Sequence, residues 1–223
     1  DCFAFWNPER GIAVSDSVNG VFPDLRTTDG KTWHSISANL PPALSGEGSF
    51  ASSGTCVATQ GNKTAWIVTG AATVGPSTKA RILATNDGGN TWQVHEAPFP
   101  SSAPSGAFTI AFHDSVHGMA GGGSNDPKDT SQAATAVSSD GGKTWTLTGK
   151  PPVTGTVFGL AYAGNRAYGA ERARSVVITA NAGGAAWTPD EGTTWFPLNG
   201  VTGYWGVAFA SPKAGWLVGT KGR

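Results

Sequence analysis

The sequence predicts an all-β protein, a β-propeller built from four-stranded antiparallel blades. Two observations indicate this fold class: a turn that ends in tryptophan occurs four times, and each copy follows the same series of short hydrophobic runs. The four tryptophans are separated by 59, 53 and 50 residues. A repeated unit of about fifty residues made of short strands is typical of propeller blades. We therefore expect each repeat to form one sheet that stacks on its neighbours.

The four turns read TTDGKTW (27–33), TNDGGNTW (85–92), SSDGGKTW (138–145) and TPDEGTTW (188–195), and we call them the aspartate turns. Their aspartates and tryptophans are Asp29 and Trp33, Asp87 and Trp92, Asp140 and Trp145, and Asp190 and Trp195. An aspartate carboxylate at such a turn can accept hydrogen bonds from backbone amides, and glycine adopts positive φ at little cost. The tryptophan then carries a large ring into the space between sheets. We expect these residues to be structural and not catalytic.

The hydrophobic runs predict strands. Four segments share an alanine–aromatic pair, a polar turn and a short apolar run: CFAFWNPERGIAVSD (2–16), TIAFHDSVHGMAGGG (109–123), GLAYAGNRAYGAE (159–171) and GVAFASPKAGWLVGT (206–220). The segment 55–70 is a looser copy. Such runs, bounded by Gly, Pro, Asn and Asp, are typical of strands joined by hairpins. No segment has a 3.6-residue apolar stripe with capping residues, so we expect almost no helix.

The repeats indicate a single propeller domain over residues 1–223. We expect blades at roughly 1–45, 46–100, 101–152 and 153–200 and a half blade at 201–223. About four and a half blades do not close a circle, and an open ring leaves edge strands exposed. Either the chain is part of a longer ring of six or seven blades, which we favour, or another chain covers the edges.

The aspartate turn resembles the Asp-box, also called the BNR repeat, of sialidases, sortilin-type receptors, xyloglucanases and photosystem II stability/assembly factors. Three turns match its pattern fully, and TTDGKTW is one residue short, which predicts a tighter or irregular turn. The resemblance implies that the turns lie at the blade periphery, between the third and fourth strands and away from the central site. The chain as a whole looks most like the assembly-factor type, whose ring closes with seven blades.

Composition excludes several classes. Fifteen basic and fifteen acidic residues give a formal net charge of zero, so the chain lacks the basic footprint of a nucleic-acid-binding protein. The sequence contains no run of 18 apolar residues, so it predicts no transmembrane helix. No signal peptide or lipidation motif is visible, and the chain begins inside a predicted strand, which is compatible with removal of an upstream signal.

The two cysteines, Cys2 and Cys56, occupy equivalent positions in the innermost strands of adjacent predicted blades. Equivalent positions come within disulfide range only near the narrow end of the channel. Two alternatives stay open: a disulfide, or two buried thiols that act as small apolar residues.

No catalytic set can be assembled from the sequence. A sialidase, as the resemblance implies, needs an arginine triad, a Tyr–Glu pair, an aspartic acid and an Arg-Ile-Pro motif, and this chain has no Arg-Ile-Pro. Tyr162 and Glu171 could form the Tyr–Glu pair, but we assign Glu171 to a hairpin. A glycosidase with two carboxyl groups places them about 5–10 Å apart. The remaining candidate aspartates lie in predicted loops with no visible pairing: Asp16, Asp24, Asp114, Asp126 and Asp129.

We expect no metal and no cofactor. His113 and His117 have the i, i+4 spacing of a zinc pair, but that spacing places both rings on one side only in a helix, and here it spans a β-turn. Asn125, Asp126 and Asp129 offer oxygen ligands that calcium prefers, but an ordinary solvated loop is the favoured interpretation.

Arginine and aromatic residues are common anchors of protein interfaces, and a group of them falls in the fourth blade and at the start of the next. These candidate partner-binding residues are Arg166, Arg172, Arg174, Tyr204 and Trp205.

Two functions remain. The favoured one is a non-catalytic scaffold outside the cytoplasm, peripheral to a membrane, that binds or helps assemble a membrane protein complex, with a photosynthetic complex as the example the resemblance offers. The alternative is a glycan-active or glycan-binding propeller of the sialidase-like class. The apolar inner strands favour the scaffold.

Overall fold

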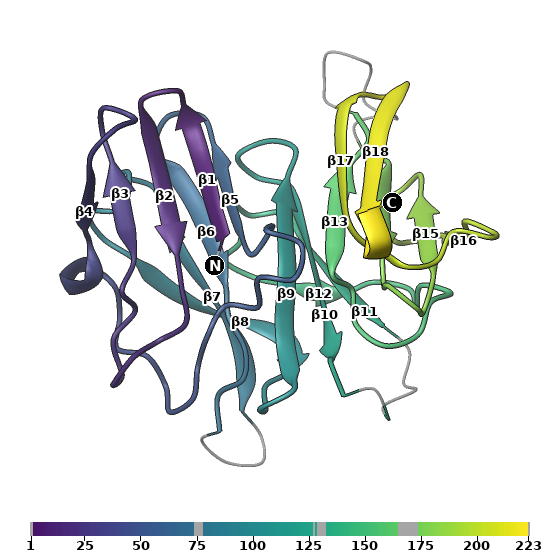
Figure 1. Ribbon diagram of the computed structural model, residues 1–223, viewed down its shortest axis with the longest axis horizontal. Coiled ribbons are helices and arrows are strands. Elements are labelled where there is room, and N and C mark those ends of the chain that lie inside the picture. The colour runs from purple at the N-terminus through teal and green to yellow at the C-terminus, as the bar shows by residue number, and fades with distance from the viewer. Residues whose placement is uncertain (1, 74–77, 127, 129–132, 165–173, 223) are drawn as a thin grey trace.

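The computed structural model describes residues 2–73, 78–126, 128, 133–164 and 174–222, and it is almost entirely β (Figure 1). Within these residues, helix is confined to two 3-10 turns, Ser37–Asn39 and Thr220–Gly222. The prediction of an all-β chain with almost no helix is confirmed. In this part of the chain no helix is long and apolar enough to cross a lipid bilayer.

The strands form four four-stranded antiparallel sheets and one two-stranded sheet. The first sheet contains β1 (Cys2–Asn7), β2 (Arg10–Val14), β3 (Leu25–Thr27) and β4 (Trp33–Ser35). The second contains β5 (Val57–Gln60), β6 (Thr64–Val68), β7 (Lys79–Thr85) and β8 (Gln93–Pro100). The third contains β9 (Ser105–Phe112), β10 (Gly118–Ser124), β11 (Ala134–Ser138) and β12 (Thr146–Leu147). The fourth contains β13 (Gly159–Tyr162), β14 (Val176–Thr179), β15 (Ala185–Thr188) and β16 (Phe196–Pro197), and the last contains β17 (Tyr204–Ser211) and β18 (Ala214–Gly219).

Each sheet is a simple meander whose first strand lies innermost. The first strands contact one another in chain order, β1 with β5, β5 with β9, β9 with β13 and β13 with β17 (Figure 1). The sheets are therefore the blades of a partial β-propeller, and the predicted fold class is confirmed. In each four-stranded blade the strand ends joined by the first–second and third–fourth connections lie at one end, which we call the turn face, and the remaining strand ends lie at the opposite face.

An aromatic ring of the first strand lies over a glycine of the second strand in three blades. Phe5 pairs with Gly11 and Phe112 pairs with Gly118, and the same pairing joins Phe209 to Gly215 in the last sheet. A Cβ atom on Gly11 would stand 2.7 Å from a ring carbon of Phe5, and one on Gly118 would stand 2.6 Å from Phe112. The space next to the ring therefore admits only a hydrogen atom, which explains the aromatic–turn–glycine pattern in the sequence.

The indole of Trp66 is the largest fully buried side chain and joins the second and third blades. It stacks on Phe112 with ring centroids 3.5 Å apart, and its Nε1 donates a 2.8 Å hydrogen bond to the carbonyl of Gly141. Trp145 meets the same phenylalanine edge-on, at 5.9 Å between centroids. The tryptophans that end the aspartate turns are only half-buried, so Trp66 fills more of the space between blades than they do.

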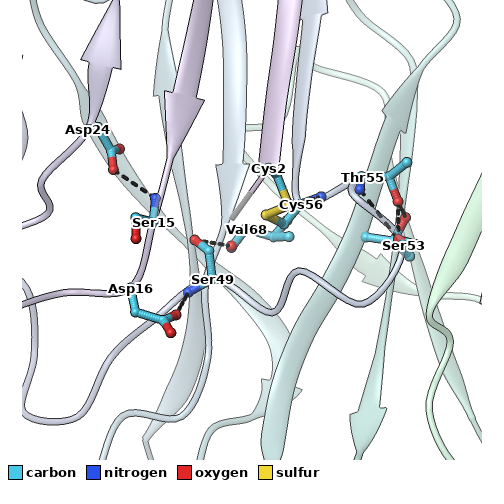
Figure 2. The surroundings of a disulfide bond; sticks show 10 residues. Cys2, Ser15, Asp16, Asp24, Ser49, Ser53, Thr55, Cys56 and Val68 are labelled. Atoms are coloured by element: carbon cyan, nitrogen blue, oxygen red, sulfur yellow. Dashed lines mark hydrogen bonds between the residues drawn. A yellow bond between two sulfur atoms is a disulfide. The ribbon is translucent and has the colours of Figure 1, made fainter.

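Cys2 in β1 and Cys56, directly before β5, form a disulfide that joins the first two blades (Figure 2). It lies at the end of the sheets away from the aspartate turns. Both residues are buried, and their Cα atoms are 5.8 Å apart. A cross-link between residues 54 positions apart removes chain entropy worth about 4 kcal/mol from the unfolded state. The bond therefore holds the first blade on the second.

Asp24 is a buried carboxyl group with an incomplete set of partners. Its Oδ1 accepts a 3.1 Å hydrogen bond from the backbone N–H of Ser15 (Figure 2), whereas its Oδ2 has no hydrogen-bond partner among the described residues. Burial raises the pKa of Asp24 to about 7, and the bond from Ser15 opposes that rise only in part. The fold therefore favours the protonated carboxyl group.

Replacing Trp66 with Ala is expected to lower the free energy of unfolding by about 3–5 kcal/mol, because it opens a cavity between two blades. The measurement is urea-induced unfolding followed by circular dichroism. Trp216, which is 60% exposed, is the matched control, and its replacement with Ala is expected to change stability little. Equal effects of the two substitutions would contradict the packing described here.

Replacing Asp24 with Asn is expected to flatten the dependence of stability on pH. The folded-state pKa of about 7 lies above the unfolded value near 3.8, so wild-type stability falls as pH rises from about 4 to 7. The variant should match wild type near pH 4 and exceed it above pH 7. Unfolding curves at several pH values test this, with Asp126→Asn as an exposed control. A variant that is less stable at pH 8 would contradict the expectation.

Candidate functional site

The four aspartate turns all lie on the turn face, between the third and fourth strands of their blades. In the three longer turns the aspartate Oδ1 accepts a backbone hydrogen bond from the residue four positions later: Thr91 at 3.0 Å, Thr144 at 3.0 Å and Thr194 at 2.8 Å. In the shorter first turn Asp29 accepts the equivalent bond from Thr32, three positions later, at 2.7 Å. The first turn is tighter by one residue but keeps the same carboxylate contacts.

The residue after the aspartate ties each longer turn to the first hairpin of its own blade. The N–H groups of Gly88 and Gly141 donate 2.9 Å bonds to the carbonyls of Lys63 and Val116. In the fourth blade Glu191 donates the corresponding bond to the carbonyl of Arg174, at 3.1 Å. This position has φ of +76° and +79° in the glycines and +55° in Glu191. The left-handed region suits glycine, so a glutamate here is locally unfavourable.

Hydrogen bonds hold the turn aspartates in their ionised form. Partial burial would raise the pKa of Asp87 and Asp140, but bonds from the backbone and hydroxyl of Thr91 and Thr144 outweigh it and lower both to about 2. The pKa of Asp29 is lowered by the bonds of Thr32, and that of Asp190 is lowered by the bond of Thr194 against the effect of burial. The carboxylates stabilise their own turns, as a structural role requires.

A cluster of ionisable side chains lies between the third and fourth blades on the turn face, and we call it the His113 cluster. Three members come from the β9–β10 hairpin, one from the end of β13, one from the segment before β14 and one from the fourth aspartate turn. They are His113, Asp114, His117, Tyr162, Arg174 and Glu191.

Glu191 is the centre of one half of the cluster. Its Oε1 accepts a 3.0 Å hydrogen bond from the Tyr162 hydroxyl and lies 3.2 Å from His113 Nε2, and its Oε2 accepts a 3.0 Å bond from Arg174 Nε. Burial opposes ionisation, but the contacts with His113, Arg174 and Tyr162 lower the pKa of Glu191. Burial, and next the charge of Glu191, raise the pKa of Tyr162 well above its ordinary value.

Asp114 is the centre of the other half. Its Oδ1 accepts backbone bonds from Val116 and His117, both 2.7 Å, and its Oδ2 lies 3.0 Å from His117 Nδ1 and 3.6 Å from His113 Nδ1. Burial alone would raise the pKa of Asp114, but the bonds from His117 and Val116 hold it well below its usual range. The imidazole of His113 therefore stands between two carboxylates.

The hairpin brings His113 and His117 together, contrary to the argument from their spacing. The backbone N–H of His113 donates to the carbonyl of His117 at 3.2 Å, and the two rings are stacked with centroids 5.4 Å apart. A tight turn places its first and last residues opposite each other, so a helix is not needed for a spacing of four to converge. The spacing argument against a common site was wrong on this point.

Two hollows flank the cluster. A crevice of about 520 Å³ between the third and fourth blades is lined by both histidines, Arg174, Glu191 and the third aspartate turn. A second hollow of about 550 Å³ lies at the centre, where the ends of β5, β9, β13 and β17 meet. Its described lining residues include Gln60, Phe112 and Phe209 but no Asp, Glu, Lys or Arg. We call this second hollow the channel mouth.

The structure separates the candidate partner-binding residues. Arg174 precedes the Val176 end of β14 on the turn face, whereas Tyr204 bridges to Asn181, beyond the other end of that strand. Trp205 packs against Phe158, with ring centroids 4.7 Å apart. Arg174 therefore does not share a face with Tyr204 and Trp205. Arg166 and Arg172 lie outside the described residues.

The side chain that contacts the Tyr162 hydroxyl was not identified from the sequence. Glu171 and Asp129 lie outside the described residues, and Glu191 is the residue that contacts the tyrosine hydroxyl. A signal was present: the fourth aspartate turn has Glu191 where the other three have glycine after the aspartate.

No family model and no curated protein matches the chain. Among solved structures, YCF48 bound to a D1 peptide is similar over 97% of this chain and 59% of its own length, at 20% identity and a TM-score of 0.56. An ancestral GH74 enzyme is similar over 100% of this chain and 29% of its own length, at 15% identity and a TM-score of 0.60. The GH74 xyloglucanase from Xanthomonas campestris is similar over 89% of this chain and 30% of its own, at 14% identity and a TM-score of 0.57.

These likenesses show the fold, a β-propeller. The chain spans less than two thirds of the length of each of these proteins.

Replacing Asp140 with Asn is expected to cost about 1–3 kcal/mol of stability at pH 7, since charge-assisted bonds to the turn are lost. Because the folded pKa of about 2 lies below the unfolded value of 3.8, the carboxylate stabilises the fold above pH 4 and this contribution disappears as pH falls towards 2. Thermal unfolding at pH 7 and pH 2.5 tests this, with exposed Glu9→Gln as the control. An equal destabilisation at both pH values would contradict the assignment.

Proposed function

We propose that this chain is a non-catalytic, extracytoplasmic β-propeller scaffold of the Asp-box type that binds a protein segment and thereby assists the assembly or stability of a membrane protein complex. The observation that carries the proposal is the chemistry of the channel mouth. Aromatic, small apolar and uncharged polar side chains line most of it, together with His113, and its described lining includes no Asp, Glu, Lys or Arg.

A channel mouth of this kind suits an uncharged peptide better than a glycan undergoing hydrolysis. Glycosidases need two carboxyl groups on opposite sides of the scissile bond, about 5–10 Å apart. Phe112, Phe209 and the half-buried Tyr162 instead offer aromatic surface, and Thr59 and Gln60 offer hydrogen bonds. Aromatic anchors with a few polar groups around them are typical of protein-binding surfaces.

The likeness to YCF48 supports the same class of function. A propeller similar to this one over 97% of the chain is seen with a D1 peptide bound. The proposal further holds that the partner of this chain belongs to a membrane protein complex, photosynthetic or other. The crosslinking experiment below tests this part of the proposal.

The alternative function is that of a glycan-active propeller, and one observation favours it. Tyr162 and Glu191 form a Tyr–Glu pair with Asp114 and Arg174 nearby, which is similar to the residue set that the sialidase resemblance implies. GH74 enzymes are also among the similar structures. However, the ring of His113 occupies the space between the two carboxylates, where a glycosidic bond would have to sit. We therefore place this function second.

Placing a photo-crosslinking phenylalanine analogue at Phe209, which lines the channel mouth, tests the scaffold proposal. We expect a single covalent adduct with one subunit of a membrane complex after irradiation of native membranes, identified by mass spectrometry. The matched control carries the same analogue at Phe196, 43% exposed on the outer strand β16, and should not give that adduct. The same adduct from both positions, or none from Phe209, would contradict binding at the channel mouth.

Hydrolysis assays distinguish the alternative. We expect no turnover of sialyl, β-glucosyl or xyloglucan reporter substrates. Turnover that is lost in Glu191→Gln but kept in Glu9→Gln would overturn the proposal and establish the glycan-active function.

A further inference from the structure

His113 is buried beside two carboxylates, but its ring nitrogens have no well-aligned hydrogen bond. Its side chain is 5% exposed, and neither Nδ1 nor Nε2 makes a well-aligned hydrogen bond to any described residue. Nε2 lies 3.2 Å from Glu191 Oε1, close enough for a bond that a small rotation would align. Unpaired buried polar groups cost free energy and are rare in native proteins. The contacts of His113 with Asp114 and Glu191 therefore leave its ring nitrogens available to a cation.

We propose that His113, Asp114 and His117 bind a divalent transition-metal ion of the zinc class. One ligand atom from each residue, a ring nitrogen or a carboxylate oxygen, lies within 4.8 Å of the other two. Asp114 Oδ2 is 3.0 Å from His117 Nδ1 and 3.6 Å from His113 Nδ1. Zinc lies about 2.0–2.2 Å from nitrogen and oxygen ligands, so neighbouring ligand atoms in a tetrahedral site stand about 3.3–3.5 Å apart. Closing the site requires the two stacked rings to turn until a nitrogen lone pair of each points at the same ion.

Glu191 completes the arrangement from the far side of the ring. A histidine that binds a metal usually donates its other N–H to a carboxylate or carbonyl, which fixes the tautomer and the direction of the ring. Glu191 Oε1 lies 3.2 Å from Nε2 of His113, and Nδ1 of the same ring faces Asp114. A metal ion bound to Nδ1 would leave the Nε2–H of His113 free to donate to Glu191.

The backbone of Glu191 agrees with a specific role for its side chain. It occupies the left-handed position that the other long turns fill with glycine, a placement that is unfavourable for a residue with a Cβ. Its carboxylate contacts Tyr162, Arg174 and His113, and these three contacts offset the unfavourable backbone conformation.

The ion would be reachable from solvent and incompletely coordinated by this chain. The crevice of about 520 Å³ is lined by His113, His117 and Glu191, and the side chain of His117 is 37% exposed. Three protein ligands leave at least one position of a four-coordinate ion for water or for a group of a bound molecule. Imidazole and carboxylate ligands together favour zinc and its transition-metal neighbours over calcium or magnesium.

Zinc titration by isothermal calorimetry on the metal-free 223-residue chain tests the proposal. We expect one tight site per chain, and with cobalt(II) a visible absorption spectrum of low-symmetry coordination. His117→Gln, at a half-exposed position that does not threaten folding, should abolish both signals. His34→Gln, an exposed histidine outside the cluster, should leave them unchanged. Absence of a one-to-one site in the wild type, or the same affinity in His117→Gln, would overturn the proposal.

Replacing Glu191 with Gly separates a metal-positioning role from a structural one. Glycine relieves the left-handed strain but removes the partner of the Tyr162 hydroxyl, so the two effects on the stability of the metal-free variant oppose each other, while its affinity for zinc should fall by about 10–100-fold. Zinc should also raise the melting temperature of the wild type more than that of this variant. Unchanged zinc affinity in Glu191→Gly would overturn the assigned role of the glutamate.

Discussion

The hydrogen bond between each long aspartate turn and the first hairpin of its blade is the constraint on which the turn face depends. Its donor must lie in the left-handed region, so glycine occupies the position in two of the three long turns and Glu191 in the other. The same bond sets the distance between the aspartate turn and the first hairpin of its blade. In the fourth blade it therefore fixes where the Glu191 carboxylate points, and this places it against the ring of His113 in the neighbouring blade.

Packing between blades gives the face its rigidity. Trp66 of the second blade and Trp145 of the third both contact Phe112, one by stacking and one edge-on, and the glycine opposite Phe112 leaves room for the ring. The indole N–H of Trp66 also reaches the third aspartate turn. Because the contact of Trp66 combines apolar burial with a satisfied hydrogen-bond donor, it fixes the position of the second blade relative to the third. A rigid frame is suited to presenting fixed groups to a partner.

Charge is distributed unevenly over the turn face. The carboxylates and cations of the third and fourth blades face one another in the crevice between them, whereas the described lining of the channel mouth includes no Asp, Glu, Lys or Arg. The two hollows therefore differ in chemistry: one suits a peptide with apolar and hydrogen-bonding groups, and the other suits a cation. His113 lines both hollows.

The all-β class, the repeat and the aspartate turns were determined by the sequence alone, because each depends on residues that are close along the chain. A turn needs its aspartate, its glycines and its threonine within eight positions, and the spacing of such turns along the chain gives the number of blades. The equivalence of Cys2 and Cys56 was visible in the same way, although the choice between a disulfide and two thiols was not. The His113 cluster was decided only by tertiary structure. His113 and Glu191 are far apart in sequence and meet because adjacent blades pack side by side, while His113 and His117 face each other because the segment between them turns sharply. Local pattern determines which turns and strands form; the stacking of blades determines which of their side chains share a site.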